Sequence, residues 1–295
     1  MNRKKSLNIF AYSMSIPAFI LFIFFMIVPT IYIFVMSLFS WMGLNDPMKF
    51  VGLSNFEILF KDPNFYHAFK NTVFLIVFVT IVTLTIAVLM ASILVRENVK
   101  GKSLFRVIFY IPNILSIVVI AAIFGAIYHP TNGMLNSVIS FFKGEPHTWD
   151  WIGQHSTVLY AIMVALIWQA IGYYMVMYMA SMASIPEHLY ESSSLDGATG
   201  RQQFFNITLP LVWNTIRTTL TFFVISTINL SFLLVKAISY TRTDGASEVF
   251  LSFLYKQADN NTYGYAMAAG VIIFIFSFAL SALINKITKR EVYQY

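Results

Sequence analysis

Six long stretches of the sequence carry almost no charged residues, and each is long enough to cross a membrane as a helix. A helical span needs about 20 apolar residues, and the chain is 58% hydrophobic and only 11% charged. A typical soluble domain is about 25% charged. The sequence therefore predicts an all-α integral membrane protein with one domain over residues 1–295. Its six predicted transmembrane helices cover residues 13–39, 71–95, 107–128, 157–183, 213–235 and 262–285.

The distribution of basic residues predicts which loops face the cytoplasm, because cytoplasmic loops carry an excess of Lys and Arg. With a cytoplasmic N-terminus, twelve basic residues fall on inner segments and six on outer segments, while Lys236 lies at an outer boundary. An even number of spans places both termini on one side, which agrees with the basic clusters at 3–5 and 289–290. We therefore expect cytoplasmic N- and C-termini and a cytoplasmic loop at residues 184–212.

The loop at residues 184–212 is polar and is broken by glycine, although it lies between two apolar runs. Pro186 suits the first turn of a helix, and acidic residues suit its positive end. We predict a short helix over residues 187–195 that lies outside the membrane. Its apolar side is expected to hold Leu189 and Leu195.

The other face of this predicted helix carries Glu191, Ser192 and Ser193, which we expect to project toward a partner protein. A carboxylate there can accept a bidentate arginine from that partner. Gly197 and Gly200 permit the sharp backbone reversal that ends the helix. An ordinary solvated loop helix is the alternative interpretation of the same pattern.

The spacing of this segment resembles the EAA loop of ABC-importer permeases. That loop reads Glu-Ala-Ala, three residues, Gly, nine residues, Ile, one residue, Leu-Pro, and the chain departs from it by Ser192-Ser193 in place of Ala-Ala. Serine is also small, so a partner surface can still approach closely. The resemblance implies that this segment couples the chain to a separate ATPase, with the contacts carried by Glu191, Ser192, Ser193, Asp196, Gly197, Ala198, Ile207, Leu209 and Pro210.

Three stretches are similar to the carbohydrate branch of these permeases, the maltose type: residues 185–198, residues 50–56 and residues 263–268. The family resemblance implies a non-catalytic transport subunit in a prokaryotic cell membrane, with no cofactor of its own. It implies pairing with a second, homologous permease and with two copies of a cytoplasmic ATPase that binds ATP and Mg. It further implies an extracellular or periplasmic solute-binding protein that delivers a carbohydrate.

Polar residues within the spans are the candidates for a solute pathway, although helix-packing hydrogen bonds are the common alternative. No full charge lies deep in a predicted span, which argues against a proton relay and fits a neutral polyol. Aromatic faces, amides and hydroxyl groups suit a sugar. The candidates are Asn113, Trp168, Gln169, Tyr173, Thr227 and Asn229.

Several other functions are weighed against this interpretation. Gly101-Lys102-Ser103 resembles the end of a phosphate-binding loop, but position 96 is Arg where that loop needs Gly. The absence of cysteine excludes thiolate metal sites, and basic residues flank spans rather than forming a nucleic-acid patch. One alternative is an ABC permease for another solute such as a phosphodiester or oligopeptide. A self-sufficient secondary transporter would need intramembrane carboxylates or paired broken helices with repeat symmetry, and a membrane-embedded enzyme would need clustered His, Asp or Glu at one depth. The sequence shows neither feature.

Overall fold

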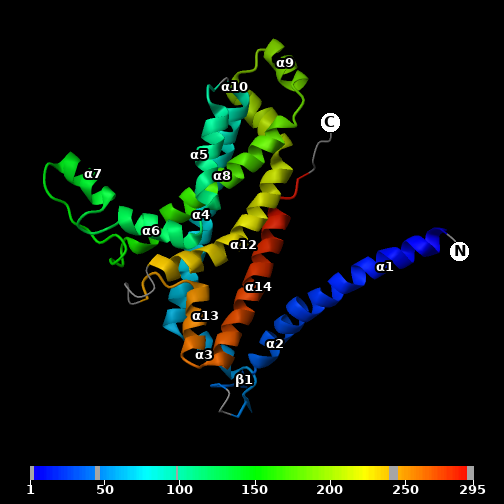
Figure 1. Cartoon of the computed structure of the whole chain (residues 1–295), viewed down its shortest axis with the longest axis vertical. Helices are drawn as coiled ribbons and strands as arrows, with labels where there is room; N and C mark the ends of the chain where they lie inside the picture. Colours follow the sequence, from blue (N-terminus) through cyan, green and yellow to red (C-terminus); the bar gives the residue numbers. More distant parts are fainter. Residues whose placement is uncertain (1–2, 44–46, 98, 239–244, 291–295) are drawn as a thin grey trace. The chain divides into compact units, whose positions relative to one another are not determined.

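The computed structural model describes residues 3–43, 47–97, 99–238 and 245–290, with the backbone alone for residues 3–9 (Figure 1). The described part of the chain is mostly helical. It divides into two compact units: Met1–Phe65 with Leu254–Phe276, and Tyr66–Phe253 with Ser277–Tyr295. The single-domain organisation stays a prediction.

The first unit begins with a long helical segment and a small hairpin. Its elements are α1 (Arg3–Phe22), the π-helical turn η1 (Ile23–Ile27), α2 (Val28–Met36), β1 (Phe39–Ser40), β2 (Lys49–Phe50), α3 (Ser54–Leu59) and the first half of α14 (Tyr263–Ile287). The hairpin is antiparallel and pairs Phe39 with Phe50. Asn55 of α3 fastens it, because its amide donates to the carbonyl oxygens of Ser37 at 2.8 Å and Phe39 at 3.0 Å.

The second unit contains the remaining helices and the large hydrophobic core. Within it α5 packs against α8, and α12 packs against α8 and α6. Its elements are nearly all of α4 (Pro63–Arg96), α5 (Lys102–Ile114), α6 (Ile117–Ile127), α7 (Met134–Lys143), α8 (Val158–Ala183), α9 (His188–Leu195), α10 (Gly200–Gln203), the π-helical turn η2 (Phe204–Thr208), α11 (Leu209–Leu211), α12 (Trp213–Ile238), the start of α13 (Phe250–Asp259) and the end of α14. The rest of α13, from Leu254, belongs to the first unit.

Five helical segments among the described residues are long and apolar enough to cross a membrane: Phe10–Met36, Pro63–Arg96, Val158–Ala183, Trp213–Ile238 and Tyr263–Ile287. They coincide with five of the six predicted spans to within a few residues at most ends, although α4 begins earlier than predicted. The prediction of a helical membrane protein is therefore confirmed. The cytoplasmic location of the termini stays a prediction.

The predicted third span is not one straight helix. The structure divides it into α5 and α6, which meet at 102° in the second unit (Figure 1). Leu115 and Ser116 between them have extended backbones, and the Ser116 hydroxyl accepts from the amide of Val119 as an N-cap. The pair counts as a sixth span only if it crosses as a broken helix. Proline within α5 and a capping serine favour such a break.

A buried asparagine joins α4 to the segment that precedes α13 in the second unit. The Asn71 amide nitrogen donates to the carbonyl oxygens of Ala246 at 3.0 Å and Glu248 at 2.8 Å. The neighbouring Thr72 hydroxyl accepts from the amide of Phe250 at 2.8 Å. These bonds satisfy backbone groups of a non-helical segment that would otherwise be buried without partners.

Replacing Asn71 with Leu is expected to destabilise the protein by about 2–4 kcal/mol, because two buried carbonyl groups lose their donor. The measurement is the midpoint of thermal unfolding of the purified protein. Asn64→Leu is the matched control, since Asn64 lies exposed in the first turn of the same helix. Equal midpoints for the two variants would contradict this role for Asn71.

Candidate functional site

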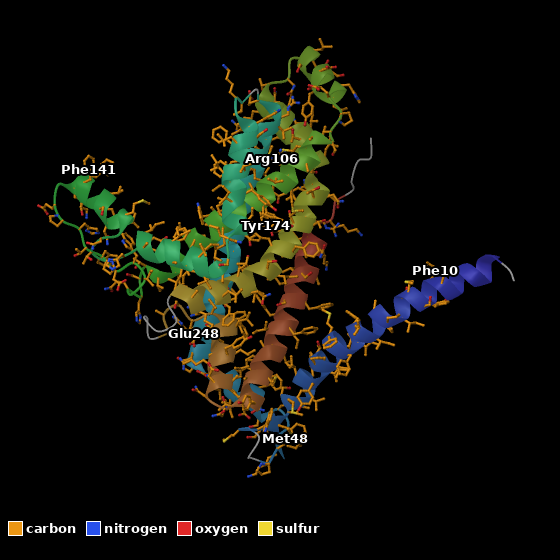
Figure 2. The ribbon with its side chains drawn as sticks, in the orientation of Figure 1. Phe10, Met48, Arg106, Phe141, Tyr174 and Glu248 are labelled. Atoms are coloured by element: carbon orange, nitrogen blue, oxygen red, sulfur yellow. The ribbon has the colours of Figure 1, made fainter. Side chains whose placement is uncertain are left out.

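A cavity of about 730 Å³ lies in the second unit between α5, α8 and α12. Tyr174, whose position on α8 is marked in Figure 2, forms part of its wall. The described residues that line the cavity are all uncharged and combine aromatic rings, amides and hydroxyl groups. They are Asn113, Gln169, Ala170, Tyr173, Tyr174, Met177, Thr218, Thr219, Phe222, Phe223, Ser226, Asn229 and Leu230.

Four of the six pathway candidates line this one cavity: Asn113 from α5, Gln169 and Tyr173 from α8, and Asn229 from α12. Gln169 is only 8% exposed, and its buried Oε1 has no hydrogen-bond partner in the part of the chain that the structure describes. A buried polar atom without a partner calls for an explanation, and a bound ligand is one. The structure thus gathers these four residues around an unused acceptor.

Trp168 and Thr227 lie outside the lining of the cavity. The Trp168 ring packs edge-on against Phe124 of α6 with centroids 5.5 Å apart. Thr227 is buried, and its hydroxyl donates to the carbonyl oxygen of Phe223 on its own helix at 2.8 Å. Trp168 is adjacent to Gln169, and Thr227 is two positions from Asn229, but each step along a helix turns the side chain by about 100°.

The α12 wall contains the candidate Asn229 together with Thr218, Phe222 and Ser226, which are not among the six candidates. Thr218, Phe222, Ser226 and Asn229 follow one another at intervals of four, four and three residues. This spacing places them on one helix face. A search for that period would have found the wall, because it includes Phe222 as well as the polar residues.

The close approach of α5 and α8 depends on Gly172. A Cβ atom at this position would overlap the carbonyl oxygen of Phe109 in the α5 backbone. Close backbone contact at a small residue is typical of membrane helices. Gly172 lies between Gln169 and Tyr173 on α8, so this contact sets the distance from those two side chains to α5.

The loop between α8 and α12 forms the helix α9, with Glu187 at its N-cap. Tyr190 is its buried anchor. The Tyr190 hydroxyl bonds to the Thr208 hydroxyl at 2.9 Å, and the Tyr190 carbonyl oxygen accepts from Gln203 Nε2 at 3.2 Å. These bonds hold α9 against α10 and η2, so the loop is an ordered unit.

Arg96 ties the same loop to the end of α4. Its guanidinium stacks 3.4 Å from the centre of the Tyr190 ring, and its Nη2 donates to Gln203 Oε1 at 3.3 Å. A cation over an aromatic face is attracted by the ring quadrupole. Tyr190 and Gln203 therefore form a hub that no spacing within the loop reveals, since Arg96 is far away in the sequence.

The exposed surface of α9 differs in part from the prediction. Glu191 and Ser192 are exposed as expected, whereas the Ser193 hydroxyl turns inward, donates to the Tyr190 carbonyl oxygen and accepts from Gln203 Nε2. Leu189 packs against the core, but Leu195 is 90% exposed and not on the apolar side. The buried apolar face of α9 therefore includes Leu189 but not Leu195.

Gly197 ends α9, as the sequence predicts. Its φ is +80°, and two bonds close a Schellman cap: Ala198 N–H donates to Ser193 O at 2.9 Å, and Gly197 N–H donates to Ser194 O at 3.0 Å. The prediction that Gly200 takes part in the reversal is wrong, because Gly200 begins α10 with a negative φ.

The remaining loop candidates lie on the return to α12. Asp196 is exposed at the C-cap of α9, and Ala198 is half-buried. Ile207 and Leu209 are half-buried and pack against the hydrophobic core, whereas Pro210 is exposed within α11. Among these remaining candidates, only Asp196, at the α9 end, has an exposed polar side chain.

This architecture, a helical membrane protein with an uncharged cavity between its helices and an ordered loop helix, is that of a transport permease. Residues 83–292, more than half of the chain, match the family model of the binding-protein-dependent transport system inner membrane component. The chain belongs to this family. It is therefore a multi-pass membrane protein of a binding-protein-dependent transport system.

Individual relatives agree with this assignment. The chain is 34% identical to the probable ABC transporter permease protein YurN of Bacillus subtilis, over 96% of this chain and 97% of that one. It is 27% identical to the diacetylchitobiose uptake system permease protein NgcF of Streptomyces coelicolor, over 91% and 80%. The crystal structure of a bacterial ABC transporter involved in the import of the acidic polysaccharide alginate has the same fold, with a TM-score of 0.86, 24% identity and 99% coverage of both chains.

Proposed function

We propose that the chain forms half of the translocation pathway of an ATP-driven importer for a sugar or oligosaccharide. The observation that carries this proposal is the uncharged cavity between α5, α8 and α12. Its volume of about 730 Å³ lies within the range of about 300–1,000 Å³ that small-molecule sites occupy. One relative is named for the uptake of diacetylchitobiose and another for the transport of arabinooligosaccharides, and both names support a carbohydrate as the solute.

The chemistry of the cavity wall suits a sugar. Tyr173 and Phe222 offer aromatic faces for the C–H side of a sugar ring. Asn113, Gln169 and Asn229 offer amide donors and acceptors for its hydroxyl groups. The unpartnered Oε1 of Gln169 gains a donor when a hydroxyl group enters. An anionic solute would need a cation in this wall, and none of the described lining residues provides one.

The proposal includes the partners that the transport cycle needs. A second, homologous permease completes the pathway, and two copies of a cytoplasmic ATPase bind ATP and Mg. A solute-binding protein delivers the carbohydrate from outside, while both termini and α9 face the cytoplasm. The exposed Glu191, Ser192 and Leu195 are the surface on which the ATPase docks. The chain itself then catalyses no reaction and needs no nucleic acid.

Replacing both Gln169 and Asn229 with Leu is expected to lower sugar uptake by about tenfold or more. Each amide supplies a neutral hydrogen bond of about 0.5–1.5 kcal/mol, and about 1.4 kcal/mol corresponds to a factor of ten. The measurement is ATP-dependent uptake by the assembled complex in proteoliposomes, with diacetylchitobiose and arabinooligosaccharides as the first radiolabelled probes.

Thr221→Val is the control for this experiment. Among the described residues, the Thr221 hydroxyl bonds only to the Arg217 carbonyl oxygen of its own helix, and Thr221 lies outside the cavity lining. This variant should transport as the unmodified chain does. Undiminished uptake by the double Leu variant would show that the cavity is not part of the solute pathway. Uptake of a dipeptide but of no sugar would favour the other-solute permease, and uptake without ATP would favour a secondary carrier.

A further inference from the structure

A second pocket, of about 480 Å³, lies in the second unit where three helices end or begin. Arg96 closes α4, Lys102 opens α5, and Ala183 closes α8, and all three residues line the pocket. Glu187 and Tyr190 complete it from the base of α9. Since α4 and α8 are membrane spans, the pocket lies at the boundary between the hydrocarbon core and water.

The polar wall of this pocket is strongly basic. Its charged lining residues are Arg96, Lys102, Arg106 and Glu187, so three cations and one anion give a net charge of +2. Figure 2 marks the position of Arg106 on α5. Within the described ranges, no carboxylate oxygen lies within 4.0 Å of these three cations. The basic groups thus lack the acidic partners that a purely structural cluster would contain.

Other residues that line the pocket are apolar. They include Val176, Met179 and Ala180, which form its α8 wall. A free phosphate or a nucleotide has no use for such a wall, whereas an acyl chain can lie along it. On α5 itself, Leu104 and Ile108 are exposed apolar residues beside the basic ones. Basic pockets between transmembrane helices bind the headgroups of anionic lipids.

We propose that this pocket binds an anionic phospholipid, with the phosphate held by Lys102 and Arg106 and an acyl chain along the α8 wall. Ser103 offers a hydroxyl donor beside them. The Arg96 guanidinium forms the floor, since it is already stacked on Tyr190 and bonded to Gln203. Bound lipid would join α5 to the base of α9. The proposal depends on neither the transported solute nor the side of the membrane on which α9 lies.

The first test uses the purified transport complex that contains this chain. Two lipids with identical acyl chains, phosphatidylglycerol and phosphatidylcholine, are added to it in separate titrations. The midpoint of thermal unfolding should rise saturably with phosphatidylglycerol alone. Lys102→Gln combined with Arg106→Gln should weaken the apparent affinity for phosphatidylglycerol by about 25-fold, because each basic residue contributes a factor of about five. Lys100→Gln removes the same charge as one of these changes but does not line the pocket, so it should leave the affinity unchanged.

Three results would overturn the lipid site: an equal response to both lipids, an equal response to inorganic phosphate, or a Lys100→Gln variant as weak as the double variant. A second measurement avoids dependence on the folding of the Gln variants. The chain contains no cysteine, so Ser103→Cys provides a single position for a fluorophore. Phosphatidylglycerol with a nitroxide headgroup should quench it more than the phosphatidylcholine analogue does, and a label at Lys100→Cys should show no such difference. Equal quenching at position 103 by both lipids would contradict the proposal.

Discussion

Gly172→Ala is expected to separate α5 from α8 and to remove most of the folded protein. The new methyl group would overlap the backbone carbonyl of Phe109, and a backbone cannot move aside as a flexible side chain does. Overpacking costs about 1–3 kcal/mol and sometimes more, and this contact belongs at the upper end. The measurements are the yield of monodisperse protein and the midpoint of its thermal unfolding.

Gly125→Ala on α6 is the matched control, because its Cβ would meet no described atom within 4 Å apart from its chain neighbours and the backbone of its own helix. Both substitutions add one methyl group to a helical glycine, so they share the gain in helix propensity. A normal yield for Gly125→Ala with a loss for Gly172→Ala would locate the effect in the α5–α8 contact. Equal behaviour would show that the two helices do not depend on this close approach.

The transmembrane helices were predictable because the signal is long and local. Residues 157–183 and 213–235 contain enough consecutive apolar residues to identify α8 and α12, whichever neighbours they pack against. The ends were less certain, as α4 shows by beginning at Pro63 and not near residue 71. Polar residues in its first two turns are compatible with a helix that extends beyond the hydrocarbon core.

The bend between α5 and α6 was not predicted, because its signals are weak within an apolar run. Pro112 was visible, but proline is tolerated in membrane helices. The capping role of Ser116 becomes evident only from its extended backbone and its bond to Val119. A serine in an apolar stretch more often bonds within its own helix, so sequence alone gives no reason to choose a break here.

The types of residue in the candidate site could be predicted from the sequence, but the directions of their side chains could not. Gln169 lines the cavity, and its neighbour Trp168 does not, although both suited a sugar equally well. The choice depends on which side of α8 faces α5 and α12, and that is decided by packing over the whole unit. The hub around Tyr190 was missed for a related reason, since Arg96 reaches Gln203 across 107 positions of the chain.

Gly197→Pro is expected to abolish sugar uptake and solute-stimulated ATP hydrolysis by the assembled complex while the chain stays in the membrane. Proline requires φ near −65°, whereas Gly197 has φ of +80° and donates its N–H to Ser194 O. The Schellman cap cannot form, so the end of α9 must change direction. The membrane helices are separate from this turn, and their stability should change little. The measurements are uptake and ATP hydrolysis, each normalised to the amount of complex.

Glu191→Lys separates docking from loop folding, because Glu191 is exposed and the described residues provide no hydrogen bond to its side chain. Reversing this charge should lower coupled transport as Gly197→Pro does, while leaving α9 intact. Glu97→Lys, which reverses an exposed charge beside the end of α4, should transport normally. If Glu191→Lys and Gly197→Pro both kept full uptake, α9 would not transmit the work of the ATPase. Loss in Gly197→Pro alone would assign transmission to the direction of α9 and not to the charge on its surface.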